Sequence, residues 1–257
     1  HRGVLTMTLT LYGVEIWTVA LMFARIGAIL MLLPGFGEPA IPARIRLSFA
    51  LALAIMLAPA LAQTVPQPAA TALGMAGQVT GEIIIGVLIG GAARILVAAL
   101  ATAGQIAGVE IGIAFAQTAD PTMTQSGQLL SVFLGVMGMA LIFATGLDHM
   151  FLRGVAGSYQ VIALGTPPPT GDAAQMALEA TAAAFRVGFQ IAMPLLAAGL
   201  LFRAGMGVLS RLIPQIQVFF VVLPLQILGG LVVLAIGLSA GMLIWLDSLQ
   251  RYATWLG

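Results

Sequence analysis

The last apolar run of the chain restricts its fold more than any other feature. No charged residue lies between Arg211 and Asp247, and as a continuous helix this run would be roughly 50 Å long at about 1.5 Å per residue. Only 7% of the 257 residues are charged and the mean hydropathy is +1.08, whereas soluble domains average about 25% charged residues. We therefore predict an all-α, integral membrane-type bundle of long kinked helical hairpins.

The charged and sulfur-containing residues exclude several functional classes. The ten basic residues are all arginine, and nine acids leave a net charge of +1, so neither nucleic acid nor a polybasic lipid anchor is expected. Because the chain has no cysteine, disulfides, thiolate metal sites and cysteine nucleophiles are excluded. A P-loop ATPase is excluded as well, since its phosphate-binding lysine is missing. We expect no cofactor and no metal.

Hydrophobic runs divide the N-terminal half into candidate spans. The first is Leu11 to Leu33, which contains Glu15 and Arg25. These two charges are too far apart for a pair within one turn, so each should find a partner on another helix or at an interface. Two arginines follow a Pro- and Gly-rich turn and precede the second span, Leu47 to Ala62. The positive-inside rule then places this first connection in the cytoplasm.

The remaining spans suggest two parts. A third span begins near Gly77 and extends beyond one bilayer thickness, and a fourth covers Leu129 to Leu147. Phe151 to Leu164 is more mixed, and is interpreted as the end of a kinked helix or as an interfacial helix. A Pro-rich stretch, Thr166 to Asp172, then marks the clearest boundary. We predict N-terminal hairpins over residues 1–165, with a central loop near 112–125, and a C-terminal kinked hairpin over residues 173–257.

The stretch from Gly104 to Gln128 is the candidate functional element. Gly104, Gly108 and Gly112 recur every four residues, which suits close approach of another helix. Pro121 disfavours helical geometry at the residue before it, so we expect the helix to break near the Asp-Pro pair. Irregular backbone at membrane depth is tolerated where protein buries it or where it lines a water-filled cavity. The stretch is therefore predicted to be a gate or pathway element, with an ordinary surface turn as the alternative.

Several ionisable residues lie within apolar tracts. Such groups are either proton-relay residues or ion pairs. Pairing is favoured, because none of them has an i,i+4 partner that would close a pair within one helix. The residues expected to form inter-helix ion pairs are Glu82, Arg94, Glu110, Arg186 and Arg203.

One enzyme motif occurs in the last apolar run. Gly237, Ser239 and Gly241 fit G-x-S-x-G, and His149 would be the base of an intramembrane serine hydrolase. That motif needs a strand, a sharp turn and a helix, whereas this run is continuously apolar and helix-like. Two small residues four positions apart are more typical of a helix contact, so we expect no enzyme.

Five sequence segments occur in the order typical of one family. They are PGFGEPAIPARIRLSFALALA after Arg25, then GEIIIGVLIGG, AGQIAGVEIGIAFAQTADP, FRVGFQIAMP and SRLIPQIQVFFVVLPLQI. With them the chain resembles the FliR family of flagellar biosynthetic proteins, whose virulence relatives serve type III secretion injectisomes. The likeness covers nearly the whole chain, and its most specific parts are AGQIAGVEIGIAF with the following Asp-Pro pair and the segment that starts at Arg211.

The resemblance implies an export-gate subunit of the flagellar type III secretion apparatus, in the bacterial inner membrane and the flagellar basal body. Its implied partners are the flagellar P-type and Q-type proteins, the B-type switch protein, the A-type export component, membrane lipid and unfolded exported proteins. The segment that closes the pore in the family corresponds here to Gly112, Ile113, Ala114, Phe115, Ala116, Gln117, Thr118, Ala119, Asp120 and Pro121. The same role in a virulence injectisome is the alternative, and a generic transporter is a further one.

Overall fold

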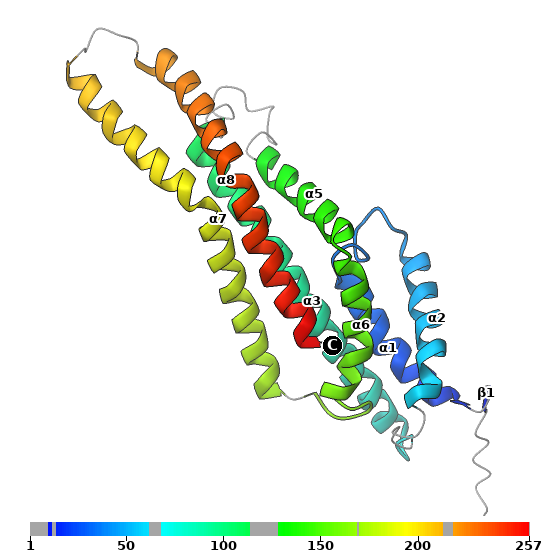
Figure 1. Cartoon of the computed structure of the whole chain (residues 1–257). Coiled ribbons are helices and arrows are strands. Elements are labelled where there is room, and N and C mark those ends of the chain that lie inside the picture. The colour runs from blue at the N-terminus through cyan, green and yellow to red at the C-terminus, as the bar shows by residue number, and fades with distance from the viewer. Residues whose placement is uncertain are drawn as a thin grey trace, which may run out of the picture. The chain divides into compact units, whose positions relative to one another are not determined.

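A computed structural model describes residues 10–11, 14–61, 68–113, 128–168, 170–212 and 218–256 (Figure 1). Nearly all of these residues are helical, which confirms the predicted all-α class. The exception is a minimal antiparallel ladder, in which β1 (Thr10–Leu11) pairs with β2 (Val14–Glu15). The first helix starts at Ile16, later than the expected span, because Val14 and Glu15 form a strand.

The helices are long and apolar. Their bounds are α1 Ile16–Leu32, α2 Ala43–Leu61, α3 Ala72–Ile111, α5 Leu129–Ala144, α6 Leu147–Val161, α7 Thr170–Leu212 and α8 Val218–Leu256. Four of them, α2, α3, α7 and α8, are long and apolar enough to cross a membrane. The α5–α6 pair adds a fifth candidate span if it is taken as one broken helix, bent by 73° at Gly146, whose φ is 71°.

The chain forms two compact units, whose boundaries fall inside α3, α7 and α8 and between α5 and α6. The first unit contains residues 1–94, 146–180 and 251–257, and the second contains residues 95–145 and 181–250. The division into residues 1–165 and 173–257 stays a prediction.

Close helix contacts through small residues build the first unit. Ala50, Ala54 and Ala58 of α2 are fully buried at four-residue spacing, and α2 packs on α1. On α3, a Cβ at Gly86 would lie 2.6 Å from the Arg25 carbonyl oxygen, and one at Gly90 would lie 2.8 Å from the Ile29 carbonyl oxygen. These contacts bring the backbones of α1 and α3 together, as small-residue pairs do in membrane helices.

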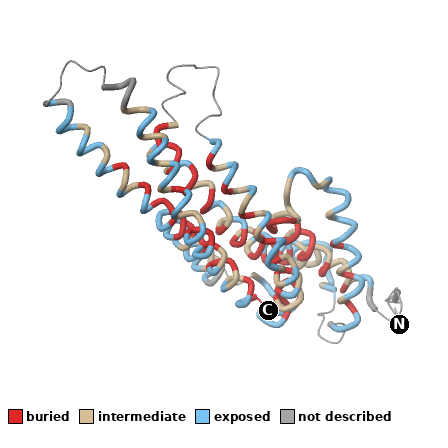
Figure 2. The backbone as a smooth tube through the Cα atoms, turned by 45° about the horizontal axis from the view of Figure 1, so that its top comes forward, coloured by how far each residue is buried: buried red, intermediate tan, exposed pale blue. Residues whose placement is uncertain are grey.

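The second unit is built on the C-terminal part of α3. In this unit α7 and α8 lie side by side (Figure 1), and a Cβ at Gly241 would lie 3.1 Å from Ile191 Cγ2. Trp245 of α8 is fully buried and donates its indole N–H to the Leu96 carbonyl oxygen at 3.1 Å. Figure 2 shows buried positions recurring at short intervals along the long helices, with exposed positions between them.

The exposed faces of these helices are apolar. Leu201 of α7 is 73% exposed and Ile236 of α8 is 76% exposed, and many large hydrophobic residues on both helices are similar. Exposed apolar surface on this scale marks contact with lipid or with other proteins. The fold therefore agrees with the membrane character predicted from composition.

Candidate functional site: the end of α3

The helix that leads into the predicted gate ends at Ile111, before the Asp-Pro pair where the break was expected. Gly112 follows with a φ of +89°, and its N–H donates to the Val109 carbonyl oxygen at 3.1 Å. A left-handed glycine is the usual way to end a helix, because other residues rarely adopt that conformation. Gly112 is buried, and a Cβ there would lie 3.3 Å from Leu223 Cδ1 of α8. The predicted end of this helix was placed at the Asp-Pro pair because proline disfavours helical geometry, and the possibility of an earlier end at Gly112 was not considered.

Of the predicted gate residues, Gly112 and Ile113 are described by the structure. The others, Ala114, Phe115, Ala116, Gln117, Thr118, Ala119, Asp120 and Pro121, lie outside the described residues. Their role stays a prediction.

Glu110, in the last turn of α3, is held by two other helices. Arg203 of α7 donates from Nη2 to Oε2 of Glu110 at 2.6 Å. Gln226 of α8 donates from Nε2 to the backbone carbonyl of Glu110 at 2.8 Å. The last four carbonyls of a helix have no partner within it, so the Gln226 amide satisfies one of these groups at the end of α3. The side chain of Glu110 is 10% exposed, whereas that of Arg203 is 54% exposed.

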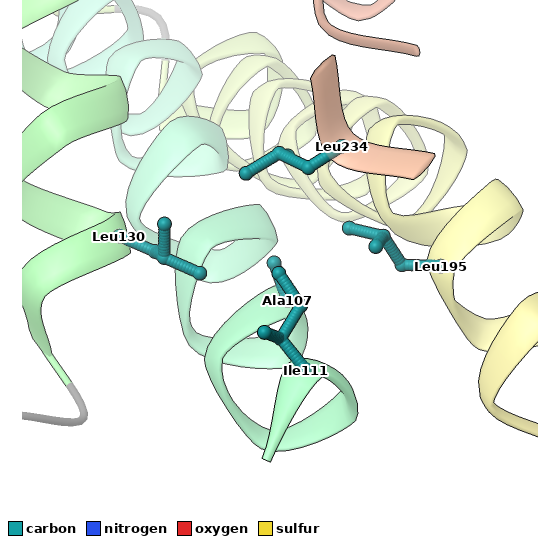
Figure 3. Close-up of a cluster of buried hydrophobic side chains, with 5 residues drawn as sticks. All are labelled: Ala107, Ile111, Leu130, Leu195 and Leu234. Carbon is teal, nitrogen blue, oxygen red and sulfur yellow. The ribbon is translucent and has the colours of Figure 1, made fainter. Parts of the chain in front are cut away.

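A buried apolar cluster includes Ile111, the residue that follows Glu110 (Figure 3). It consists of Ala107, Ile111, Leu130, Leu195 and Leu234, with Ile113, Ile227 and Val233 packed against it. Ile113 directly follows Gly112, and the other residues of the cluster belong to α3, α5, α7 and α8. The start of the predicted gate segment is therefore part of the hydrophobic core of the second unit.

Two glycines allow α7 and α8 to come this close to α3. A Cβ at Gly230 of α8 would lie 2.7 Å from Ile111 Cγ1 and 3.2 Å from its Cα. A Cβ at Gly199 of α7 would overlap Oε2 of Glu110. Neither glycine was singled out from the sequence, because each lies in a tract of many small residues and only the contact distinguishes it.

The predicted packing glycines, Gly104 and Gly108, are both buried. A Cβ at Gly104 would overlap the backbone of Ser131 in α5, and Ser131 Oγ donates to the Ala101 carbonyl oxygen at 3.0 Å. The two helices on either side of the predicted gate segment are thus in backbone contact at this point.

A second polar centre lies in the first unit, where Arg25 of α1 and Glu82 of α3 are both fully buried. Arg25 Nε donates to Glu82 Oε2 at 2.6 Å, and Nη2 donates to Oε1 at 3.2 Å. The guanidinium also lies 4.5 Å from the centre of the Tyr159 ring.

Backbone groups beyond the ion pair complete the hydrogen bonding of both charges. Arg25 also donates to three backbone carbonyls near the end of α6, those of Ser158 at 3.3 Å, Ile162 at 2.8 Å and Ala163 at 3.4 Å. The N–H of Gly165 donates to Glu82 Oε1 at 2.6 Å. A buried ion pair needs such additional hydrogen bonds to offset its desolvation.

The other two residues expected to form inter-helix ion pairs are more exposed. Arg94 of α3 lies 3.1 Å from Glu38, in the connection between α1 and α2, with 46% and 32% of these side chains exposed. Arg186 of α7 is exposed, and none of the described residues forms a hydrogen bond or ion pair with it. Arg25 and Gln226 were not among the predicted site residues. The sequence did hold a signal for Arg25. One apolar span contains this arginine and another contains Glu82, and two opposite charges in apolar helices indicate a pair.

The G-x-S-x-G motif lies in a different setting from the strand, turn and helix that a hydrolase of this kind needs. Gly237, Ser239 and Gly241 lie within the continuous helix α8, and a Cβ at Gly237 would lie 3.5 Å from Pro194 of α7. His149 is 77% exposed, with its Nδ1 3.0 Å from Asp148 Oδ1. Among the residues that the structure describes, no three His, Asp or Glu side chains are grouped as metal ligands would be.

Comparison with known proteins places the chain in one family. The family model for "Bacterial export proteins, family 1" matches residues 16–252. A flagellar biosynthetic protein FliR from Caulobacter vibrioides is 39% identical over 233 residues, which cover 91% of this chain and 93% of the relative. The FliR of Aquifex aeolicus is 31% identical over 86% of this chain and 85% of its own length. The FliR of Escherichia coli is 28% identical over 82% of this chain and 80% of its own.

Proposed function

Because the chain belongs to the bacterial export proteins of family 1, we propose that it is a pore-forming subunit of the flagellar export gate in the bacterial inner membrane. The family serves the flagellar and type III export apparatus and is not a known enzyme family. The flagellar role is preferred to the injectisome role because the relatives found here are named as flagellar biosynthetic proteins.

The end of α3 is the observation that supports a gate. A long apolar helix stops at a buried glycine where three neighbouring helices pack around it. Irregular backbone that begins within such a bundle suits protein burial or the lining of a water-filled path. We propose that Gly112 to Pro121 closes this path in the resting state. Phe115 and Met123 would then exclude water from the constriction, as apolar residues do in hydrophobic gates.

The proposed substrate is an unfolded polypeptide. Chains of many sequences have to pass, so a lining without fixed charges or deep pockets is suitable. The segment from Gly112 to Ala119 contains no charged residue. We propose that the energy for transport comes from other components, and that P-type and Q-type proteins complete the pore. The B-type switch and the A-type export component are proposed as further partners.

The test is a deletion of Ile113 to Ala119 in the full chain, expressed with its genomic neighbours. We expect the complex to assemble and to conduct small ions in vesicles, because the closing element is lost while the packing glycines remain. A deletion of the same length in the uncharged loop between α2 and α3, within Gln63 to Thr71, is the control and should not raise conductance. An assembled deletion complex that is as tight to ions as the unmodified one would contradict the gate.

A further inference from the structure

We propose that Glu110, Arg203 and Gln226 form a clasp that holds the last turn of α3, and that opening of its Glu110–Arg203 half loosens the start of the gate segment. The clasp residues come from α3, α7 and α8. This inference rests on the proposed function, because it concerns how the same element is kept closed.

The position of Glu110 makes the clasp necessary. The C-terminus of a helix has partial negative charge, so a carboxylate in the last turn is unfavourable there and a cation is favourable. The last turn of α3, all of which is described, has no basic residue of its own. Arg203 supplies the missing cation from α7 at 2.6 Å. Without it, the carboxylate and the helix end would repel each other.

Glu110 cannot easily move away from the helix end. Its side chain is 10% exposed, and the carboxylate lies against the backbone at Gly199, where a Cβ would overlap it. Its carbonyl is held separately by the Gln226 amide at 2.8 Å. Loss of Arg203 would therefore leave a nearly buried, uncompensated charge, which is worse than losing both partners.

The Glu110–Arg203 half can open because 54% of the Arg203 side chain is not covered by the rest of the chain, so few other contacts are lost when it leaves. The Arg25–Glu82 pair is different, since both side chains are fully buried and Arg25 is also bound to backbone carbonyls. Of these two pairs, Arg25–Glu82 is fixed and Glu110–Arg203 can be released, and the releasable pair lies at the start of the gate.

The chain contains no cysteine, so an Arg203→Cys variant has a single reactive thiol at the clasp. Three methanethiosulfonate reagents can be attached to it, with aminoethyl, methyl and sulfonatoethyl groups that carry positive, neutral and negative charge. Hydrogen–deuterium exchange of the peptide that covers Ala107 to Ile113 reports on the end of α3. Ion leak through vesicles that contain the full chain and its co-purified partners reports on the gate.

We expect Arg203→Cys to raise exchange in this peptide about 2- to 5-fold, as suits a half-exposed charge at a helix end, and to raise the leak in parallel. The aminoethyl group should reverse both effects, the methyl group should leave them, and the sulfonatoethyl group should increase them. A peptide around Trp245 in the same unit is the control and should not change. Equal exchange and leak with all three reagents would overturn the clasp.

A second set of variants does not depend on labelling. Glu110→Gln removes the repulsion together with the pair, so it should change exchange less than Arg203→Met does. The double variant should return to the level of Glu110→Gln alone. A double variant that exchanges as fast as, or faster than, Arg203→Met would overturn the proposal.

The two readouts separate the clasp from the proposed function. Faster exchange without any leak in Arg203→Met would overturn the clasp as a gate control, whatever the deletion of Ile113 to Ala119 shows. Unchanged exchange in that variant, combined with a leaky deletion, would overturn the clasp and leave the gate intact. Faster exchange and leak together, with a leaky deletion, would support both.

Discussion

Replacement of Arg25 by methionine should destabilise the chain more than any other single loss of charge described here. Methionine has a similar length and suits an apolar helix, so the change removes the guanidinium with little loss of volume. Glu82 would remain fully buried. It would lose both hydrogen bonds from Arg25 and retain the one that the Gly165 N–H donates to it at 2.6 Å. The three backbone carbonyls near the end of α6 would lose the hydrogen bonds that the Arg25 guanidinium donates to them.

The expected magnitude follows from this geometry. Removing one partner of a buried ion pair costs about 3–5 kcal/mol, because the other charge is left without compensation. The upper part of that range is expected, since backbone carbonyls also lose their donor. For a chain of this size such a loss lowers the melting temperature by roughly 10 °C. Arg94→Met is the matched control. Its pair with Glu38 is partly exposed, so the cost should be at most about 1 kcal/mol.

The assay is thermal unfolding of the full chain in mild detergent, followed by the loss of the folded peak on size exclusion. Arg25→Met should melt well below Arg94→Met, and adding Glu82→Met should restore part of the loss because no orphan charge remains. If Arg25→Met and Arg94→Met melt together, or if the double variant is less stable than Arg25→Met, the reasoning is wrong.

Other perturbations test packing and the absence of catalysis. Gly104→Val should abolish recovery of folded chain on size exclusion, because its side chain would overlap the α5 backbone, whereas Gly91→Ala, with nothing within 4 Å, should be recovered normally. Trp245→Phe should lower stability by about 1–2 kcal/mol in thermal unfolding, because it removes the hydrogen bond to the Leu96 carbonyl. Ser239→Ala should leave swimming motility unchanged, and a non-motile but assembled variant would reopen the question of a hydrolase.

Much of the fold follows from hydropathy, and the reasons are visible in particular segments. The uncharged run after Arg211 predicts a long helix, and α8 covers most of it. Small residues four positions apart, at Gly77 and Gly81 and at Gly86 and Gly90, predict close helix contacts on α3. Gly86 and Gly90 do lie against α1, whereas a Cβ at Gly77 would meet nothing within 4 Å. The end of α3 was placed too late, because glycine within a Gly-rich tract gives no sign of which residue adopts positive φ. Gly112 does so where α7 and α8 hold Glu110.

The candidate site was less predictable, since its contacts join residues far apart in sequence. Glu110 and Arg203 were both expected to pair, yet nothing in the spacing of single charges says which partner each one has. The structure brings these two together and pairs Glu82 with Arg25. Gln226 contributes by donating a hydrogen bond to the Glu110 carbonyl at the end of α3. No sequence pattern indicates such a contact between residues on two different helices.

The length of α3 has a consequence for biosynthesis. Its 40 residues give a contour of about 60 Å, which is twice the roughly 30 Å hydrocarbon core of a bilayer. Exposed apolar side chains occur along α3 from Leu73 to Val109, a longer stretch than the hydrocarbon core can cover, so we expect other proteins to cover the exposed turns that lie outside it. Copies made in excess of their companions would leave those turns in water and open to membrane proteases. Synthesis of this chain should therefore be matched in amount and in time to that of the proteins that receive it.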